Sequence, residues 1–154
     1  MTACLESTSG ARSPLTAFRG RAAIVFYESR GHDRDNEALK LWCAGLVDEG
    51  RIDAQVVGVA NLRGLGCVRR MVRPAVRAIA ARYGTELWMD FDGALAEPPY
   101  GLTEAGAHVL LLDPDGQVCF RASGRLADEQ VGAFLRALGA TVGGLERLPL
   151  PSAA

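Results

Sequence analysis

The sequence has almost no net charge, since 17 basic residues balance 18 acidic residues and the formal net charge is −1. Without an excess of one sign, no long-range field draws the molecule to nucleic acid or to an anionic membrane. We therefore expect neither as a partner. Lysine is also nearly absent, because Lys40 is the single one, and the abundance of arginine, alanine and glycine suggests a GC-rich bacterial genome.

Long apolar runs are missing as well. No segment approaches the roughly 20 apolar residues that a membrane-spanning helix needs. Residues 1–20 are mostly polar or small and lack the apolar run of a secretory signal peptide. These absences favour a cytoplasmic protein, in which thiols stay mostly reduced.

Close pairs of cysteine are the third absence. The four cysteines lie far apart, at Cys4, Cys43, Cys67 and Cys119. This spacing matches neither a zinc-binding pattern nor a CxxC pair. A nucleotide-binding fingerprint is missing too, so the sequence implies no cofactor.

What the sequence does contain is the pattern of one α/β domain. Hydrophobic residues make up 49% and charged residues 23%, as in ordinary globular proteins. We expect a domain over residues 15–140 between two tails, 1–14 and 141–154. Apolar runs and helical periodicity predict its elements. The expected strands are 21–28, 53–61 and 86–90, the helices are 33–50, 67–84 and 126–140, and a β-hairpin spans 108–124.

Two segments carry a family resemblance. "LTAFRGRAAIVFYE" (15–28) is similar to the segment that leads into the first strand of thioredoxin-like proteins, and "HVLLLDPDGQVCFRASGRL" (108–126) resembles their C-terminal hairpin. The likeness is to the thiol–disulfide oxidoreductase and peroxiredoxin-like branch and covers residues 15–138. It implies a thioredoxin-like α/β fold, with a central mixed sheet of about five strands and helices on both faces.

The resemblance also indicates where the family's chemistry would lie. Thioredoxin-like enzymes place CxxC between the first strand and the next helix, which here corresponds to Gly31-His32-Asp33-Arg34. Neither cysteine is present, and dithiol exchange requires an attacking thiolate and a resolving thiol. The family's cis-proline is missing too, since Ala107 and His108 occupy its place. The first interpretation is therefore a binding or interaction module, with a protein or small-molecule partner, that has lost dithiol redox chemistry.

An alternative interpretation uses one cysteine. Cys67 follows Gly64-Leu65-Gly66 and begins a predicted helix. The arginines near it are Arg63, Arg69, Arg70 and Arg73. A helix N-terminus and cationic neighbours both favour a reactive thiolate, as in a single-cysteine thiol oxidoreductase, a peroxidase-like enzyme or a redox sensor. The simpler alternative is a small apolar side chain against the sheet, and Cys43 and Cys119 are expected at or near the core.

Histidine and acidic residues gather at the predicted start of the first helix. His32 is flanked there by Glu28, Asp33 and Asp35. One interpretation is a histidine–carboxylate site for acid–base chemistry or metal binding, which His108 would join if the fold brings the two histidines to one edge. The simpler alternative is a solvated helix start in which Asp33 or Asp35 caps the helix.

Two further candidates lie elsewhere. Tyr100, in the long loop 91–107, is expected to form an aromatic platform beside the same edge. Arg69, Arg73 and Arg77 recur every fourth residue and would form a basic stripe for a phosphate, an acidic partner or RNA. A solvated helix flank paired with glutamate or aspartate is the simpler interpretation of that stripe.

Overall fold

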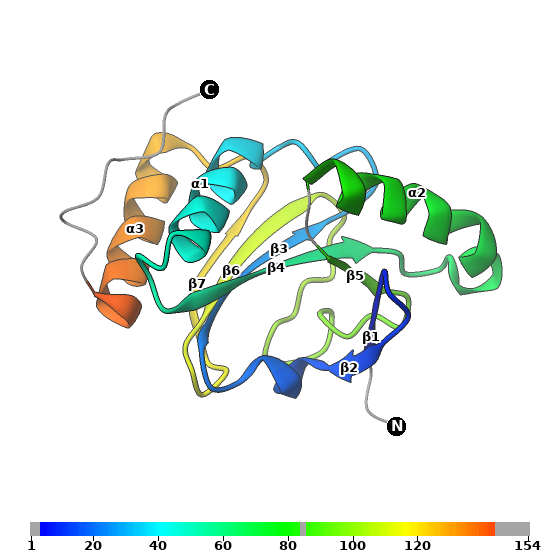
Figure 1. Cartoon of the computed structure of the whole chain (residues 1–154), viewed down its shortest axis with the longest axis horizontal. Coiled ribbons are helices and arrows are strands. Elements are labelled where there is room, and N and C mark those ends of the chain that lie inside the picture. The colour runs from blue at the N-terminus through cyan, green and yellow to red at the C-terminus, as the bar shows by residue number, and fades with distance from the viewer. Residues whose placement is uncertain (1–3, 84–85, 144–154) are drawn as a thin grey trace.

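The computed structural model describes residues 4–83 and 86–143 (Figure 1). Its strands form one mixed sheet in the order β2-β1-β5-β4-β3-β6-β7. The strands are β1 (Cys4–Ser7), β2 (Arg12–Pro14), β3 (Ala22–Glu28), β4 (Ala54–Asn61), β5 (Leu87–Asp90), β6 (Ala107–Leu112) and β7 (Val118–Ser123). The helices are α1 (Glu37–Asp48), α2 (Arg69–Tyr83) and α3 (Asp128–Val142), with 3-10 turns η1 (Leu15–Phe18) and η2 (Gly66–Val68). The sheet therefore has seven strands, not the five or so that the resemblance implied.

Strand β3 lies at the centre of the sheet and is buried along its whole length. All seven of its residues are buried, as the apolar run predicted. It pairs in parallel with β4 on one side and antiparallel with β6 on the other. A strand buried on both faces requires apolar cover on both, and the rest of the fold supplies it.

Alternate residues of β3 contribute to two separate cores, because successive side chains of a strand point to opposite faces. Ile24 and Phe26 face the side that α1 and α3 cover. Val25 and Tyr27 face the opposite side, which is covered by η1 and by the loop of residues 91–106. In Figure 1 the helices lie above the sheet, and η1 with this loop lies below it.

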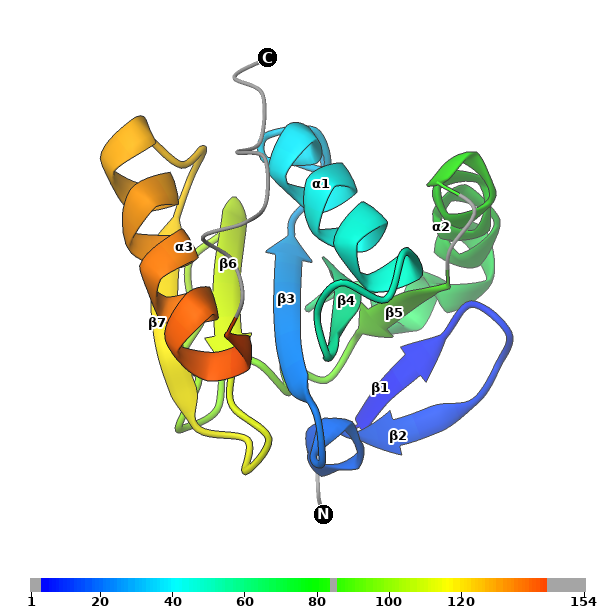
Figure 2. The same ribbon diagram turned by 60° about the vertical axis from the view of Figure 1, so that its left-hand side comes forward.

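All three α-helices of the described ranges lie on the same face of the sheet (Figures 1 and 2). The inner side of α2 packs through Val76 onto Leu87 of β5, and Leu87 pairs across Gly58 with the face of Phe26. The expectation of helices on both faces is therefore wrong for this part of the chain. The order β3, β4, β5 explains it, because two right-handed crossovers in the same direction place both helices on one face.

The N-terminal residues extend the sheet beyond the predicted strands. Strand β1 pairs antiparallel with both β2 and β5, and Leu5 is fully buried. The predicted mobile tail over 1–14 is therefore wrong for residues 4–14. This hairpin is hard to predict, because Leu5 is the one large apolar side chain of β1. At the other end α3 continues into the predicted tail as far as Val142, and residues 144–154 lie outside the described residues.

Helix α1 begins later than predicted. Its N-cap residue is Asn36, whose buried side chain makes no capping hydrogen bond. The Asn36 amide instead donates to the carbonyl of Gly124 at 3.1 Å and accepts the N–H of Leu126 at 3.0 Å. Neither Asp33 nor Asp35 caps the helix, so that prediction is wrong. Asn36 fastens the start of α1 to the chain that enters α3.

None of the helices in the described ranges is both long enough and apolar enough to span a bilayer.

We expect the substitution Asn36→Ala to lower the free energy of unfolding by about 2–3 kcal/mol, because it leaves a carbonyl and an N–H without their partner. Urea denaturation followed by circular dichroism measures this change. Arg34→Ala is the matched control, since Arg34 lies in the same turn with an exposed side chain and should leave stability almost unchanged. Equal stability of the two variants would contradict the role given to Asn36.

Candidate functional site

The loop after β3 and the loop before β6 meet at one edge of the sheet, as the resemblance implied. The N–H of Ser29 donates to the carbonyl of Gly106 at 2.8 Å, and the N–H of Gly106 donates to Ser29 Oγ at 3.0 Å. Residues 31–34, which correspond to the CxxC position, follow directly and contain no cysteine. The cis peptide bond of the described residues is Pro98–Pro99, and the bond that enters β6 is trans.

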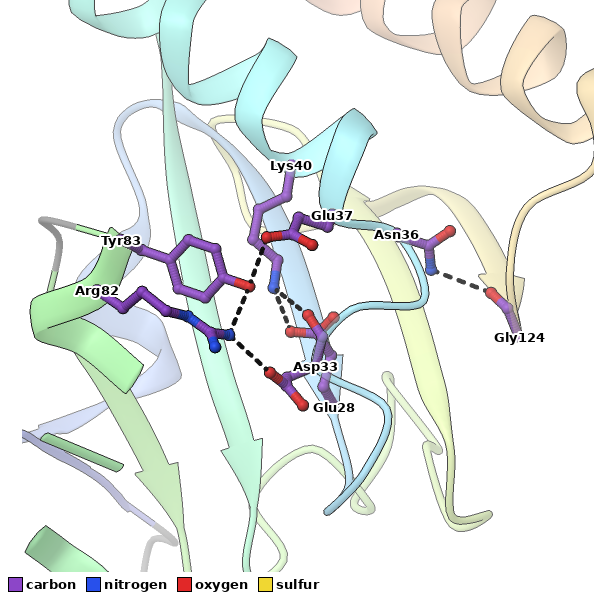
Figure 3. A network of polar contacts seen from close by, with 8 residues as sticks. All are labelled: Glu28, Asp33, Asn36, Glu37, Lys40, Arg82, Tyr83 and Gly124. Carbon is purple, nitrogen blue, oxygen red and sulfur yellow. Dashed lines mark hydrogen bonds and ion pairs between the residues drawn. The ribbon is translucent and has the colours of Figure 1, made fainter. Parts of the chain in front are cut away.

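A buried ion pair lies where β3 ends (Figure 3). Lys40 Nζ of α1 is 2.5 Å from Glu28 Oε1, and the two side chains are 12% and 9% exposed. Lys40 also donates to the carbonyl of Asp33 at 3.3 Å, and its ammonium lies over the rings of Phe26 and Tyr83. Glu28 Oε2 is buried without a hydrogen-bond partner. The single lysine of the sequence thus compensates a carboxylate that the central strand carries into the interior.

The protonation of Glu28 is governed mainly by this burial. Burial raises the pKa of the Glu28 carboxyl, because the charged form loses its hydration. The charge and hydrogen bond of Lys40 lower the same pKa, and the carboxylates of Asp33 and Asp35 raise it further, so the net shift is upward. A carboxyl with a raised pKa beside a positioned ammonium is a common feature of functional sites.

A second group of polar contacts joins the end of α2 to the start of α1 (Figure 3). Arg82 lies 3.3 Å from Asp33 Oδ2 and donates to the hydroxyl of Tyr83 at 3.2 Å. The Tyr83 hydroxyl donates in turn to Glu37 Oε1 at 3.0 Å. The sequence analysis did not select Arg82 or Tyr83, because nothing in the sequence shows that the end of one helix meets the start of another. These contacts satisfy most of the charges at this edge within the protein.

The two histidines do not form a shared site. His108 is buried, and its Nε2–H donates to the carbonyl of Glu104 at 2.9 Å. Since that carbonyl can only accept, the hydroxyl of Ser123 donates to His108 Nδ1 at 3.0 Å. Both ring nitrogens are therefore occupied, and His32 Nδ1 bonds instead to Asp35 Oδ2 at 2.8 Å. The proposed His32–His108 metal site is a wrong prediction, and the described part of the chain contains no cluster of three or more histidine, cysteine or acidic ligands.

A buried tyrosine–aspartate pair lies on the opposite face of the sheet. Asp90 is fully buried and accepts hydrogen bonds from the hydroxyl of Tyr27 at 3.0 Å and from the N–H groups of Ala94 and Leu95. Burial raises the pKa of Tyr27, and the Asp90 charge adds to this effect. The sequence analysis missed this pair, whose signal is only an acidic residue at the end of a buried strand. Its contacts hold the loop of residues 91–106 against the sheet.

Tyr100 does not lie at the edge where the sequence analysis placed it. It packs, partly buried, against the core on the face of the sheet opposite to the α-helices. Burial raises the pKa of Tyr100, and the nearby charge that lowers it belongs to Arg19. Arg19 contacts Gly116 in the turn after β6, at the far end of that strand from His108. The expected aromatic platform beside residues 31–34 is therefore absent.

The arginine stripe of α2 is turned toward the N-terminal hairpin. Arg69 and Arg73 both pair with Glu6 of β1, and Arg69 also lies 3.3 Å from Asp92. Arg77 Nε donates to the carbonyl of Thr8. The stripe is thus the paired helix flank of the simpler interpretation, and the binding role expected for Arg69 and Arg73 has no free guanidinium to support it. Their structural role is to hold α2 against β1.

The cysteines occupy four different environments. Cys67 lies in η2 and is exposed, while Cys43 is buried beneath α1, where burial raises the pKa of its thiol to about 12. Cys119 is exposed, so its expected place near the core is wrong. It points away from α3, because its neighbour Phe120 packs on Phe134.

A cavity of about 580 Å³ lies between α1 and α2, over the carboxyl ends of β3 and β4. Its polar lining includes the ion pair of Glu28 and Lys40 and two of the predicted binding residues, Gly31 and Asp33. Most of its remaining lining is apolar and comes from α2. This volume lies within the range of small-molecule sites. The edge that would carry the dithiol in the related enzymes here opens onto an apolar cavity.

The substitution Lys40→Met should destabilise the protein in a pH-dependent way. The raised pKa of Glu28 means that its contribution to stability is present at low pH and is lost as the pH rises through the folded-state pKa. Without Lys40 the charged carboxylate is unpaired, so we expect a loss of about 3 kcal/mol at pH 8 and a smaller loss at pH 5.

Urea denaturation of the wild type, Lys40→Met, Glu28→Gln and the double variant at both pH values measures this effect. Glu28→Gln is the matched control, because it keeps the shape of the side chain and removes the charge. The double variant should be more stable than Lys40→Met at pH 8. Equal losses at pH 5 and pH 8 would mean that Glu28 does not titrate in this way.

Comparison with known proteins adds information on the fold. No protein-family profile matches the chain, and no curated protein is significantly similar to it in sequence. Solved structures do match. A thiol-disulfide isomerase from Corynebacterium glutamicum has a TM-score of 0.66 at 17% identity, with 94% of this chain and 95% of that chain covered.

Two further structures are similar over almost the whole chain. A secreted disulfide oxidoreductase of Mycobacterium tuberculosis has a TM-score of 0.60 at 13% identity, with 90% of this chain and 96% of that chain covered. The bacterioferritin comigratory protein of Xanthomonas campestris, described for alkyl peroxide reduction, has a TM-score of 0.59 at 21% identity, with 90% and 89% covered. The chain therefore has the thioredoxin-like fold.

Proposed function

We propose that the protein is a thioredoxin-fold binding module that does not carry out dithiol exchange. The observation behind this proposal is the edge at the end of β3, where residues 31–34 provide no thiol and Lys40 and Glu28 form a buried pair. Dithiol exchange needs a nucleophilic and a resolving sulfur close together, and no sulfur is present in this loop.

The cavity between α1 and α2 supports binding as the alternative use of this edge. It opens beside the loop of residues 29–33, where thioredoxin-like enzymes meet their substrates, and its lining contains no cysteine. A concave and largely apolar pocket with a few polar groups is the usual form of a small-molecule site. We therefore favour a small molecule over a protein as the partner. The cytoplasmic location stays a prediction.

An insulin-reduction assay tests the loss of dithiol exchange. With dithiothreitol as electron donor, the protein should not accelerate insulin precipitation above the rate of the donor alone, and a Cys67→Ser variant should behave the same. A dithiol thioredoxin, assayed in parallel, is the positive control. Robust turnover by the wild type would refute the proposed function.

A single-cysteine enzyme or redox sensor remains the second candidate, and the exposure of Cys67 at the start of α2 favours it. Its electrostatic support is weaker than the sequence suggested. The guanidinium of Arg69 faces Glu6 and Asp92 and stacks on Phe91, so two carboxylates already offset its charge. Exposure alone does not make a thiol reactive.

Thiol labelling separates exposure from activation, because Cys119 is also exposed and is a matched control for Cys67. With iodoacetamide at pH 7 and peptide mass spectrometry, we expect Cys67 and Cys119 to react at rates within about threefold of each other. Cys43 should be protected in the folded protein, since it is buried and burial raises its pKa. Labelling of Cys67 more than about tenfold faster than Cys119 would support the thiol enzyme instead.

A further inference from the structure

The cavity between α1 and α2 has walls of a uniform chemical type. Val72, Val76 and Ile79 line it from α2, and Leu62 lines it from the end of β4. A smaller cavity of about 180 Å³ adjoins it along β4, and Lys40, Tyr83 and Leu87 line both. The two cavities together form an elongated apolar space, with a polar group partway along it.

The rim of this space carries exposed apolar side chains. The large hydrophobic residues that are exposed in the described part of the chain are Leu41, Leu65 and Met71, with exposed fractions of 52%, 38% and 78%. Leu65 and Met71 line the larger cavity, and Leu41 lines the smaller one. Apolar exposure concentrated around one opening is typical of a ligand site rather than of an ordinary surface.

The polar group at this space is balanced in charge. Glu28 pairs with Lys40 and Asp33 pairs with Arg82, so the four charges that line or border the cavity cancel. A carboxylate ligand would meet two acidic side chains, and an ammonium ligand would meet Lys40. A neutral ligand avoids both repulsions.

The carboxyl of Glu28 has unused hydrogen-bonding capacity. Its Oε1 accepts from Lys40, whereas Oε2 is buried without a partner. An ionised carboxylate can only accept, so a ligand that satisfies it must donate. Leaving a buried acceptor unpaired is unfavourable, and a ligand hydroxyl would remove that cost.

We propose that this cavity binds a neutral amphiphile, a molecule with an elongated apolar body and one hydroxyl group that donates a hydrogen bond to Glu28. The inference rests on the proposed function as a binding module and names its ligand class. The apolar body lies along α2 between Leu65 and Lys40. The hydroxyl lies at the end of β3, beside the loop of residues 29–33.

Fluorescence titration with N-phenyl-1-naphthylamine, a neutral apolar probe with one N–H donor, tests the cavity. Ala75 lines the cavity from α2, and Ala78 is an exposed residue of the same helix outside the lining. Ala75→Phe should weaken probe binding at least about tenfold by filling the site, and Ala78→Phe should change it less than about twofold. Ala75→Leu fills less of the space and should weaken binding by less, which provides a second test if the larger variant folds poorly. No saturable binding to the wild type, or equal effects of the two phenylalanine variants, would overturn the proposal.

Displacement of the probe tests the chemistry of the ligand. Octanol should displace it at about tenfold lower concentration than octyl methyl ether, which has the same apolar body but no donor. Octanoate and octylamine should displace it less well than octanol. In the double variant Glu28→Leu/Lys40→Met the preference for octanol over the ether should disappear. An equal effect of the ether on the wild type, or better displacement by a charged compound, would refute the assigned hydroxyl.

The two proposals fail separately. Insulin reduction by a protein that also binds the probe would refute the non-catalytic function and leave the ligand class standing. Absence of both turnover and probe binding would refute the ligand class alone.

Discussion

The burial of β3 is the constraint on which the rest of the structure depends. Because both of its faces and both of its edges are covered, every element of the sheet is arranged around it. The same burial carries Glu28, the last residue of β3, out of water. A carboxyl in that position must be neutralised or protonated, and α1 meets this need by placing Lys40 against it. The central strand thus determines both the cores and the polar group at its end.

The edge that results is suited to binding rather than to exchange chemistry. In a dithiol enzyme the loop after this strand presents a sulfur at a helix start, where the backbone amides favour the thiolate. Here the same loop presents carboxylates, and Lys40 and Arg82 compensate the two that border the cavity. The contacts of Arg82 and Tyr83 join α2 to α1 at one end and leave the apolar side of α2 facing an open space. The absence of the thiols and the presence of the cavity therefore concern the same edge.

The sequence predicted the local elements well and their long-range relations less well. Strand β3, the hairpin of β6 and β7, and the three helices all follow from local periodicity and turn residues. The β1–β2 hairpin was missed because Leu5 is its one strong apolar signal, while its pairing partner β5 is distant in the sequence. Residues 31–34 were placed correctly because a resemblance fixed them, but Tyr83 and Asp90 act through partners that lie 46 and 63 positions away. Whether Cys119 points inward depends on the pairing of an edge strand, which local pattern does not determine.

The choice of lysine at position 40 follows from the same geometry. The chain uses arginine for nearly all of its basic residues, yet the residue that faces Glu28 is its single lysine. A guanidinium presents five N–H donors in a rigid plane, and each buried donor requires an acceptor. The end of β3 offers Lys40 the acceptors Glu28 Oε1 and the Asp33 carbonyl, together with the faces of two aromatic rings. A compact ammonium fits this set, whereas a guanidinium would extend into the cavity and leave donors unpaired. The lysine therefore keeps the cavity open while it neutralises the carboxylate.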